Sequence, residues 1–147
     1  MAKKFLINRE SNFIAWVLLG RLNAEEMKHS IDQLIQTVRT AKMEYESVKV
    51  LIDNSCVSDE GALIFEPVIV DCWVELETWF VMNLHEADKI AVIHGGATMK
   101  FQMSKLGRSI GLDRIEKHFY ASSYKETKLQ AYQYLEISKP PTYRELG

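Results

Sequence analysis

The sequence predicts an α/β domain with a single mixed β-sheet of about five strands and packed helices, in the order ββαβαβαβα. Three observations predict this class. Runs of β-branched and aromatic residues alternate with stretches whose apolar residues recur at helical spacing. The first two runs are separated only by a short turn, which is typical of an antiparallel hairpin. Each later run follows a helix, which implies parallel pairing through right-handed crossovers.

The predicted strands are short and mostly apolar. They span residues 5–7, 13–19, 48–53, 89–94 and 114–120. Residues 14–19, 48–52 and 90–93 are too continuously apolar for strands that face water on one side. We therefore expect these three segments to be buried strands of one sheet that is covered on both faces.

The predicted helices have recognisable start signals. They span about residues 24–43, 67–84, 99–110 and 124–136. Asn23 with Glu26 has the spacing of a capping box at the start of the first helix, and Ser123 with Glu126 repeats it at the last. Thr98 is the expected cap of the third helix. The second helix begins at a proline, whose missing N–H would have no partner in a first turn anyway.

The composition is that of one ordinary globular domain. The chain has 147 residues, of which 47% are hydrophobic and 26% are charged. We expect a single domain over residues 1–138 and an extended tail over residues 139–147, which begins with Lys-Pro-Pro. Two cysteines without a secretory signal favour reduced thiols and a cytoplasmic location. No apolar run is long enough to predict a membrane span.

Charge is distributed unevenly, although the net charge is only −2. Residues 1–88 contain 8 Lys/Arg and 15 Asp/Glu, a balance of −7, whereas residues 89–147 contain 10 and 5, a balance of +5. So small a net charge gives no reason to expect a nucleic-acid partner. Residues 50–88 contain no Lys or Arg. This acidic stretch is either a solvated surface or an interaction face for a basic partner.

Residues with catalytic or ligand-binding chemistry form no recognised motif. His94-Gly95-Gly96 lies between a strand and a helix, but it matches neither the dinucleotide-binding nor the Walker loop, so a tight turn is the better interpretation. His94 and His118 could approach each other at neighbouring strand ends, where a metal or acid–base site is an alternative to a structural role. We expect no enzymatic activity, no metal and no cofactor.

The order of elements resembles the STAS fold, which is named for sulfate transporters and anti-sigma factor antagonists. The matching residues are Val50-Leu51-Ile52-Asp53, then Val57, then Asp59-Glu60-Gly61 before a helix. Over roughly residues 4–136 the chain is more similar to the bacterial SpoIIAA-like proteins, which are grouped with the Sec14 lipid-binding fold. Where the antagonists of this family carry a regulatory phosphoserine, this chain has Glu60, which has less charge and fewer acceptor oxygens than a phosphate.

The resemblance and the acidic stretch together favour a non-enzymatic regulatory or protein-interaction module. The expected partner-binding residues are Ser55, Ser58, Asp59, Glu60, Val70, Val74 and Trp79. The alternative is a binding protein for a small apolar or lipid-like ligand, because the second helix is apolar on more of its surface than one packing face requires. The same excess could be covered by a second copy in a homodimer. A third possibility is an unrecognised enzyme that uses His94 or His118.

Overall fold

The computed structural model describes residues 4–57 and 66–138, and its elements follow the predicted order. The strands are β1 (Phe5–Glu10), β2 (Phe13–Leu18), β3 (Lys49–Asn54), β4 (Lys89–His94) and β5 (Glu116–Phe119). The helices are α1 (Ala24–Glu44), α2 (Pro67–Asn83), α3 (Ala97–Ile110) and α4 (Tyr124–Leu135). The expected tail over 139–147 lies outside the described residues. Within the described ranges no helix is both long and apolar enough to cross a membrane.

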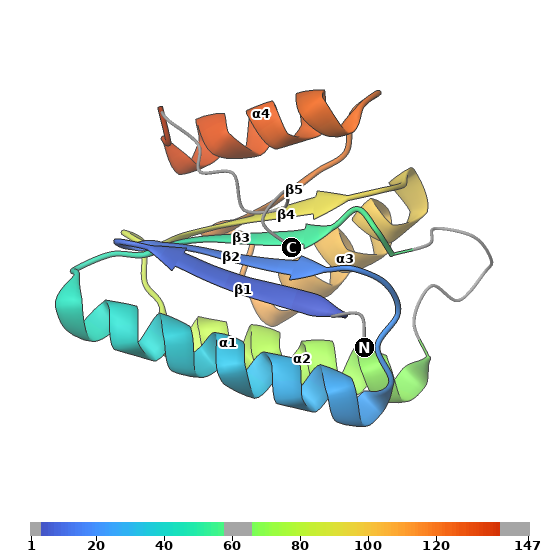
Figure 1. Ribbon diagram of the computed structural model, residues 1–147, viewed down its shortest axis with the longest axis horizontal. Helices are drawn as coiled ribbons and strands as arrows, with labels where there is room; N and C mark the ends of the chain where they lie inside the picture. Colours follow the sequence, from blue (N-terminus) through green and yellow to red (C-terminus); the bar gives the residue numbers. More distant parts are fainter. Residues whose placement is uncertain (1–3, 58–65, 139–147) are drawn as a thin grey trace.

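The five strands form one mixed sheet in the order β1-β2-β3-β4-β5, as predicted. β1 pairs with β2 antiparallel, and the pairs from β2 to β5 are all parallel. Helices α1, α2 and α3 cover one face of the sheet, and α4 covers the other (Figure 1). Because neighbouring parallel strands are also consecutive in the chain, right-handed crossovers place all three connecting helices on the same face.

Each central strand contributes to two hydrophobic cores, because successive side chains point to opposite faces of the sheet. In β2, Ile14 and Trp16 face the larger core under α1, α2 and α3, whereas Ala15 and Val17 face the smaller core under α4. All six residues of β2 are buried, and β3 and β4 are buried after their first residue. The expectation of central strands that are covered on both faces is confirmed.

The start of α1 is a complete capping box. The Oδ1 atom of Asn23 accepts from the backbone N–H of Glu26 at 2.8 Å, and Oε1 of Glu26 accepts from the backbone N–H of Asn23 at 2.9 Å. At α4 the Ser123 hydroxyl accepts from the Glu126 N–H at 3.1 Å. The two predicted caps therefore fix where these helices begin.

The prediction that Thr98 caps the third helix was wrong. Helix α3 begins at Ala97, and its N-cap is Gly96, which has extended backbone and makes no side-chain cap bond. The turn between β4 and α3 is only two residues long, so the helix has already begun where Thr98 occurs. Gly111 ends the helix in the left-handed conformation (φ 92°), as glycine commonly does at this position.

The turn after β4 packs closely against the chain that leaves β3. A Cβ atom on Gly95 would lie 2.6 Å from the carbonyl oxygen of Ser55, a backbone atom that cannot swing aside. The turn and the chain after β3 can therefore lie this close at the C-terminal ends of β3 and β4 because position 95 has no side chain.

We predict that Gly95→Ala destabilises the protein by about 1–3 kcal/mol, the usual cost of overpacking, because backbone must move to admit the methyl group. Gly20→Ala is the matched control, since a Cβ there meets nothing within 4 Å, and it should be neutral or slightly stabilising. Urea denaturation of both variants measures the difference. Equal midpoints for the two variants would contradict the close contact.

Candidate functional site

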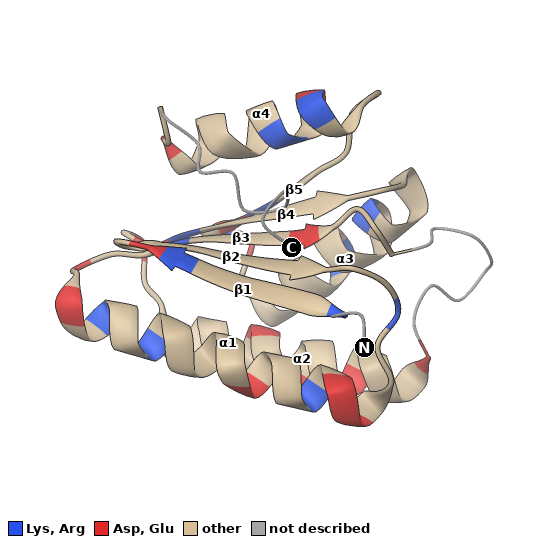
Figure 2. Ribbon diagram, viewed as in Figure 1, with Lys and Arg blue, Asp and Glu red and all other residues tan. Residues whose placement is uncertain are grey.

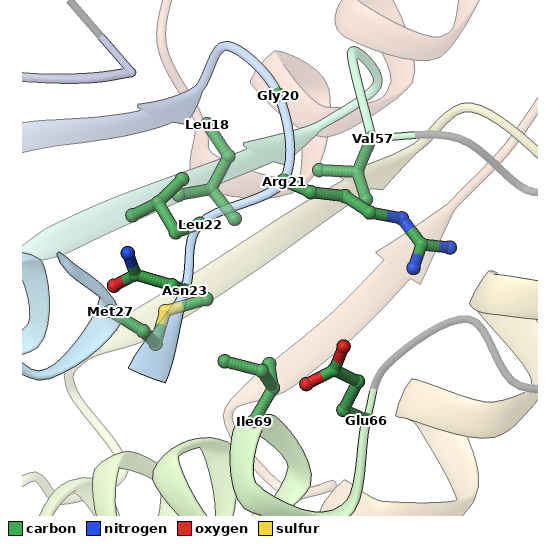
Figure 3. Close-up of a pocket in the computed structure, with 9 residues that line it drawn as sticks. All are labelled: Leu18, Gly20, Arg21, Leu22, Asn23, Met27, Val57, Glu66 and Ile69. Carbon is green, nitrogen blue, oxygen red and sulfur yellow. The ribbon is translucent and has the colours of Figure 1, made fainter. Parts of the chain in front are cut away.

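An apolar pocket opens where the chain leaves β2 and β3, between the first turns of α1 and α2 (Figure 3). Its volume is about 120 Å³. The apolar lining residues are Leu18, Leu22, Met27, Val57 and Ile69, and the others are Gly20, Arg21, Asn23 and Glu66. In Figure 3 the charged ends of Arg21 and Glu66 lie on one side of the pocket, and Leu22 and Met27 lie on the other. Ligands of open α/β sheets bind at this end of the strands.

The loop that leaves β3 is fixed by Asp53. Its Oδ1 atom accepts hydrogen bonds from the backbone N–H and the hydroxyl of Ser55, at 2.9 and 2.5 Å. Its Oδ2 atom accepts from the hydroxyl of Tyr124 on α4, at 2.8 Å. Asp53 is fully buried, so these bonds provide the polar partners that its carboxylate needs. The aspartate at the strand end thus ties the loop to a helix on the opposite face of the sheet.

The structure places the expected partner-binding residues in several settings. Ser55 is half-buried at the head of the loop, and Val70 is exposed on α2, with Val74 half-buried one turn later. Trp79 is half-buried on another side of α2, where the Arg39 guanidinium lies 5.8 Å from its ring centroid. Ser58, Asp59 and Glu60 fall outside the described residues. Val70 and Val74 therefore share a surface, and Trp79 belongs to the contact between α1 and α2.

A chain of four ionisable side chains lies between the sheet and helices α2 and α3. His94 Nε2 is 2.8 Å from His118 Nδ1, and the two rings stack with centroids 5.1 Å apart. His118 Nε2 is 2.6 Å from Oε1 of Glu116, and the Glu116 carboxyl also hydrogen-bonds to that of Glu77. The expected approach of His94 and His118 is confirmed, because their strands are parallel neighbours in the sheet.

The spacing of these groups determines the tautomers. If His118 donates from Nε2 to Glu116, its Nδ1 accepts from the Nε2–H of His94. His94 Nδ1 is then a bare acceptor, and it is one of the buried atoms that have no hydrogen-bond partner among the described residues. The others in this chain are the Oε2 atoms of Glu77 and Glu116. Burial without full pairing makes the cluster costly to charge.

The pKa values of the two carboxyl groups and of the two imidazoles shift in opposite directions, and burial is the first cause in both cases. Burial raises the pKa of Glu116 to about 7, and burial with the nearby Glu116 raises the pKa of Glu77 well above its ordinary value. Burial lowers the pKa of His118 to about 4 and, together with His118, lowers the pKa of His94. Near neutral pH the histidines are therefore uncharged, and burial favours the protonated form of the two carboxyl groups.

The geometry leaves His118 at the centre of the chain, between His94 and Glu116. Both ring nitrogens of His118 already have partners, so neither is available to accept a proton from a bound molecule. Within residues 4–57 and 66–138 no group of three or more His, Cys, Asp or Glu side chains is arranged to hold a metal ion. A buried polar network of this kind orients the elements that contribute to it.

Sequence reasoning missed Glu77 and Glu116. A signal for Glu77 was present, because it lies four residues after Trp73 and three before Phe80, which places it near the packing face of α2. For Glu116 the signal is weaker, since alternation alone assigns it to one face of β5. Gly107 completes the arrangement: a Cβ there would overlap the Glu116 carboxylate, which would then have to shift from its position in the network.

We predict that wild-type stability falls as pH rises from 6.5 to 8. The pKa of Glu116 is about 7 in the folded state and 4.5 in the unfolded state, so the folded state binds the proton more tightly. The stability that this proton binding adds to the fold is complete below pH 4.5 and is lost as pH rises through about 7. The histidines, whose pKa is lowered, affect stability only below about 6.5. Ionisation of Glu116 should lower the free energy of unfolding by on the order of 1 kcal/mol between pH 6.5 and 8.

Glu116→Gln should flatten this fall, because the amide cannot ionise. Asp113 also raises the pKa of Glu116, while Lys100 and Arg108 lower that of His118, so all three must remain unchanged in the variant. Thermal melts at pH 6.5 and 8 measure the slope, with the exposed Glu86→Gln as control. A slope in Glu116→Gln equal to that of wild type would remove Glu116 from the explanation.

No protein-family model matches the chain, and no curated protein sequence matches it. The structure has an α/β fold with one mixed five-stranded sheet, and the element order is the one that the STAS resemblance implies. Assignment to the STAS or SpoIIAA-like proteins depends on that order and on the hydrophobic pattern, and it stays a prediction.

Proposed function

We propose that the chain is a non-enzymatic protein-interaction module that binds a partner through the apolar pocket and the neighbouring exposed surface of α2. The observation that carries this proposal is the size of the pocket. At about 120 Å³ it is somewhat smaller than the roughly 150 Å³ cavity that binds one benzene molecule. Such a space suits one apolar side chain from a partner, and single buried anchors of this kind dominate many interfaces.

The surface beside the pocket supports the same proposal. Val68 and Val70, in the first turn of α2, are 43% and 37% exposed, and they flank the pocket residue Ile69. Asp71 and Glu75 are also exposed on α2, and this helix contains no Lys or Arg. An apolar centre with acidic residues along α2 complements a partner that presents an apolar anchor and basic residues that face this helix, while Arg21 lines the pocket itself.

A second candidate function is binding of a small apolar ligand in the same pocket. The apolar lining favours it, and a benzene-sized group is near the upper limit of what the space admits. A lipid-like ligand is disfavoured by volume, since pockets for drug-sized molecules measure roughly 300–1,000 Å³. Native mass spectrometry of the purified protein distinguishes the candidates, because a bound small molecule adds its mass to a single chain.

A second copy of the chain is one possible partner. The charge balance of +5 over residues 89–147 against −7 over residues 1–88 would favour contact between unlike halves of two copies. A homodimer through the α2 surface would also cover Val70 and Val74. Light scattering gives the mass in solution directly: twice 17.0 kDa supports self-association, and 17.0 kDa assigns the surface to a different protein.

We predict that Val70→Glu abolishes partner binding while leaving the fold intact. The substitution places a charge where the partner would exclude water, and the valine is already exposed, so stability should change by less than about 0.5 kcal/mol. Met43→Glu is the matched control, because Met43 is an exposed apolar residue at the far end of α1. Affinity capture from the source cells, quantified by mass spectrometry, compares both variants with wild type.

The proposal expects a basic protein that wild type and Met43→Glu retain and Val70→Glu loses. Light scattering on the same three samples should show loss of the dimer in Val70→Glu alone if the partner is a second copy. If a partner binds Val70→Glu and wild type equally well, the interface lies elsewhere than on α2. Turnover of a substrate by the purified protein would overturn the non-enzymatic assignment.

A further inference from the structure

We propose that the open edge of β5 binds an acidic segment of a partner protein as an added β-strand. Within residues 4–57 and 66–138, β5 pairs with β4 alone, so its other side is an edge of the described sheet. Such edges present unpaired backbone donors and acceptors, which bind extended peptides in several recognition domains. This surface is separate from the α2 surface and does not depend on the function proposed above.

The backbone of β5 determines which groups are available. Ile90 donates its N–H to the carbonyl of Ile115 at 2.8 Å, and in a parallel pair this turns Lys117 and Phe119 toward β4 as well. The backbone groups of Glu116 and His118 therefore point to the open edge. The Glu116 N–H already donates a hydrogen bond to the Leu112 carbonyl at 2.9 Å. His118 is left with an N–H and a carbonyl to offer to an incoming strand.

The edge lies in an open groove whose walls come from both faces of the sheet. The groove has a volume of about 420 Å³. It is lined by Lys100 of α3, Lys117, His118 and Phe119 of β5, and Gln130, Gln133 and Tyr134 of α4. Figure 1 places α3 and α4 on opposite faces of the sheet, so a strand that entered here would have a wall on each side. The side-chain amides of the two glutamines are further hydrogen-bonding groups for a bound peptide.

Charge makes the expected peptide acidic. Among the described residues, two lysines line the groove and no carboxylate does. Lys100 is on the α3 side, and Lys117 is on the α4 side, where its Nζ lies 6.0 and 5.9 Å from the ring centroids of Phe119 and Tyr134. Neither lysine forms an ion pair with a described residue. The charged residues of α3 are all Lys or Arg and those of α2 are all Asp or Glu, whereas α1 and α4 carry both kinds (Figure 2).

The two lysines also specify a pattern. Successive side chains of a strand point to opposite faces, so neighbouring residues of a bound peptide would meet Lys100 on one face and Lys117 on the other. A pair of adjacent acidic residues therefore satisfies both cations. Lysine on an edge strand commonly prevents strands from pairing. Here it would exclude neutral and basic strands, including the β5 of a second copy, and admit acidic ones.

The test uses the full chain and a fluorescein-labelled octapeptide with the sequence Glu-Glu-Val-Val-Glu-Glu-Val-Val. Fluorescence anisotropy should detect saturable binding that weakens as salt is raised. Lys100→Glu and Lys117→Glu should each weaken binding at least tenfold, because a cation is replaced by a repelling charge. Lys28→Glu, an exposed position on α1, makes the same change in net charge and should bind as wild type.

Two further peptides test the strand itself. Replacing every Glu by Lys should abolish binding, and replacing the second Val of each pair by Pro keeps the charge but removes backbone donors, so it should also abolish binding. Amide hydrogen exchange at His118 should slow when the original octapeptide binds. Equal binding of the proline peptide, unchanged exchange at His118, or equal affinity of the Lys117→Glu and Lys28→Glu variants would each overturn the proposal.

Discussion

The unequal covering of the sheet is the constraint on which the rest of the structure depends. Parallel strands that follow one another in the chain place α1, α2 and α3 side by side on one face, and only α4 covers the other (Figure 1). The three helices compete for the same area, so α2, between its two neighbours, must bury three sides. This position requires an apolar helix sequence. The exposed valines Val68 and Val70 lie on the one side of α2 that faces neither the sheet nor a neighbouring helix.

The same arrangement explains why ionisable groups are buried near β5. Helix α3 and the side of α2 that bears Glu77 face the paired strands β4 and β5, where Glu116 lies opposite Ile90 and His118 lies opposite Val92. The polar side chains there are too close to one another to be charged together. Neutral imidazoles and shared carboxyl protons let the four groups stay in a region where separate charges would be expensive.

The fold could be predicted from the sequence because its signals are local. The alternation of apolar strands with capped helices predicted the element order. Pairing of the parallel neighbours β4 and β5 brought His94 close to His118, whose register partner is Val92, two residues before His94 on the same face of β4. The pairing of the two buried carboxyl groups could not be predicted, since Glu77 and Glu116 are distant in sequence: helical spacing places Glu77 near the packing face of α2, but nothing local indicates its partner on β5. The β5 groove was missed for the same reason: its lysines come from α3 and β5, and only the folded chain brings them to one edge.

Gly107 has a consequence for how this sequence can change. Its missing side chain leaves the space that the Glu116 carboxylate occupies, and the two residues lie on different elements, α3 and β5. A change at 107 therefore affects the side chain at 116. A descendant that acquired a side chain at 107 would have to move or shorten the one at 116, and losing the glutamate would leave Glu77 and His118 without their common neighbour. In an alignment of relatives, the residue types at positions 107 and 116 should therefore covary.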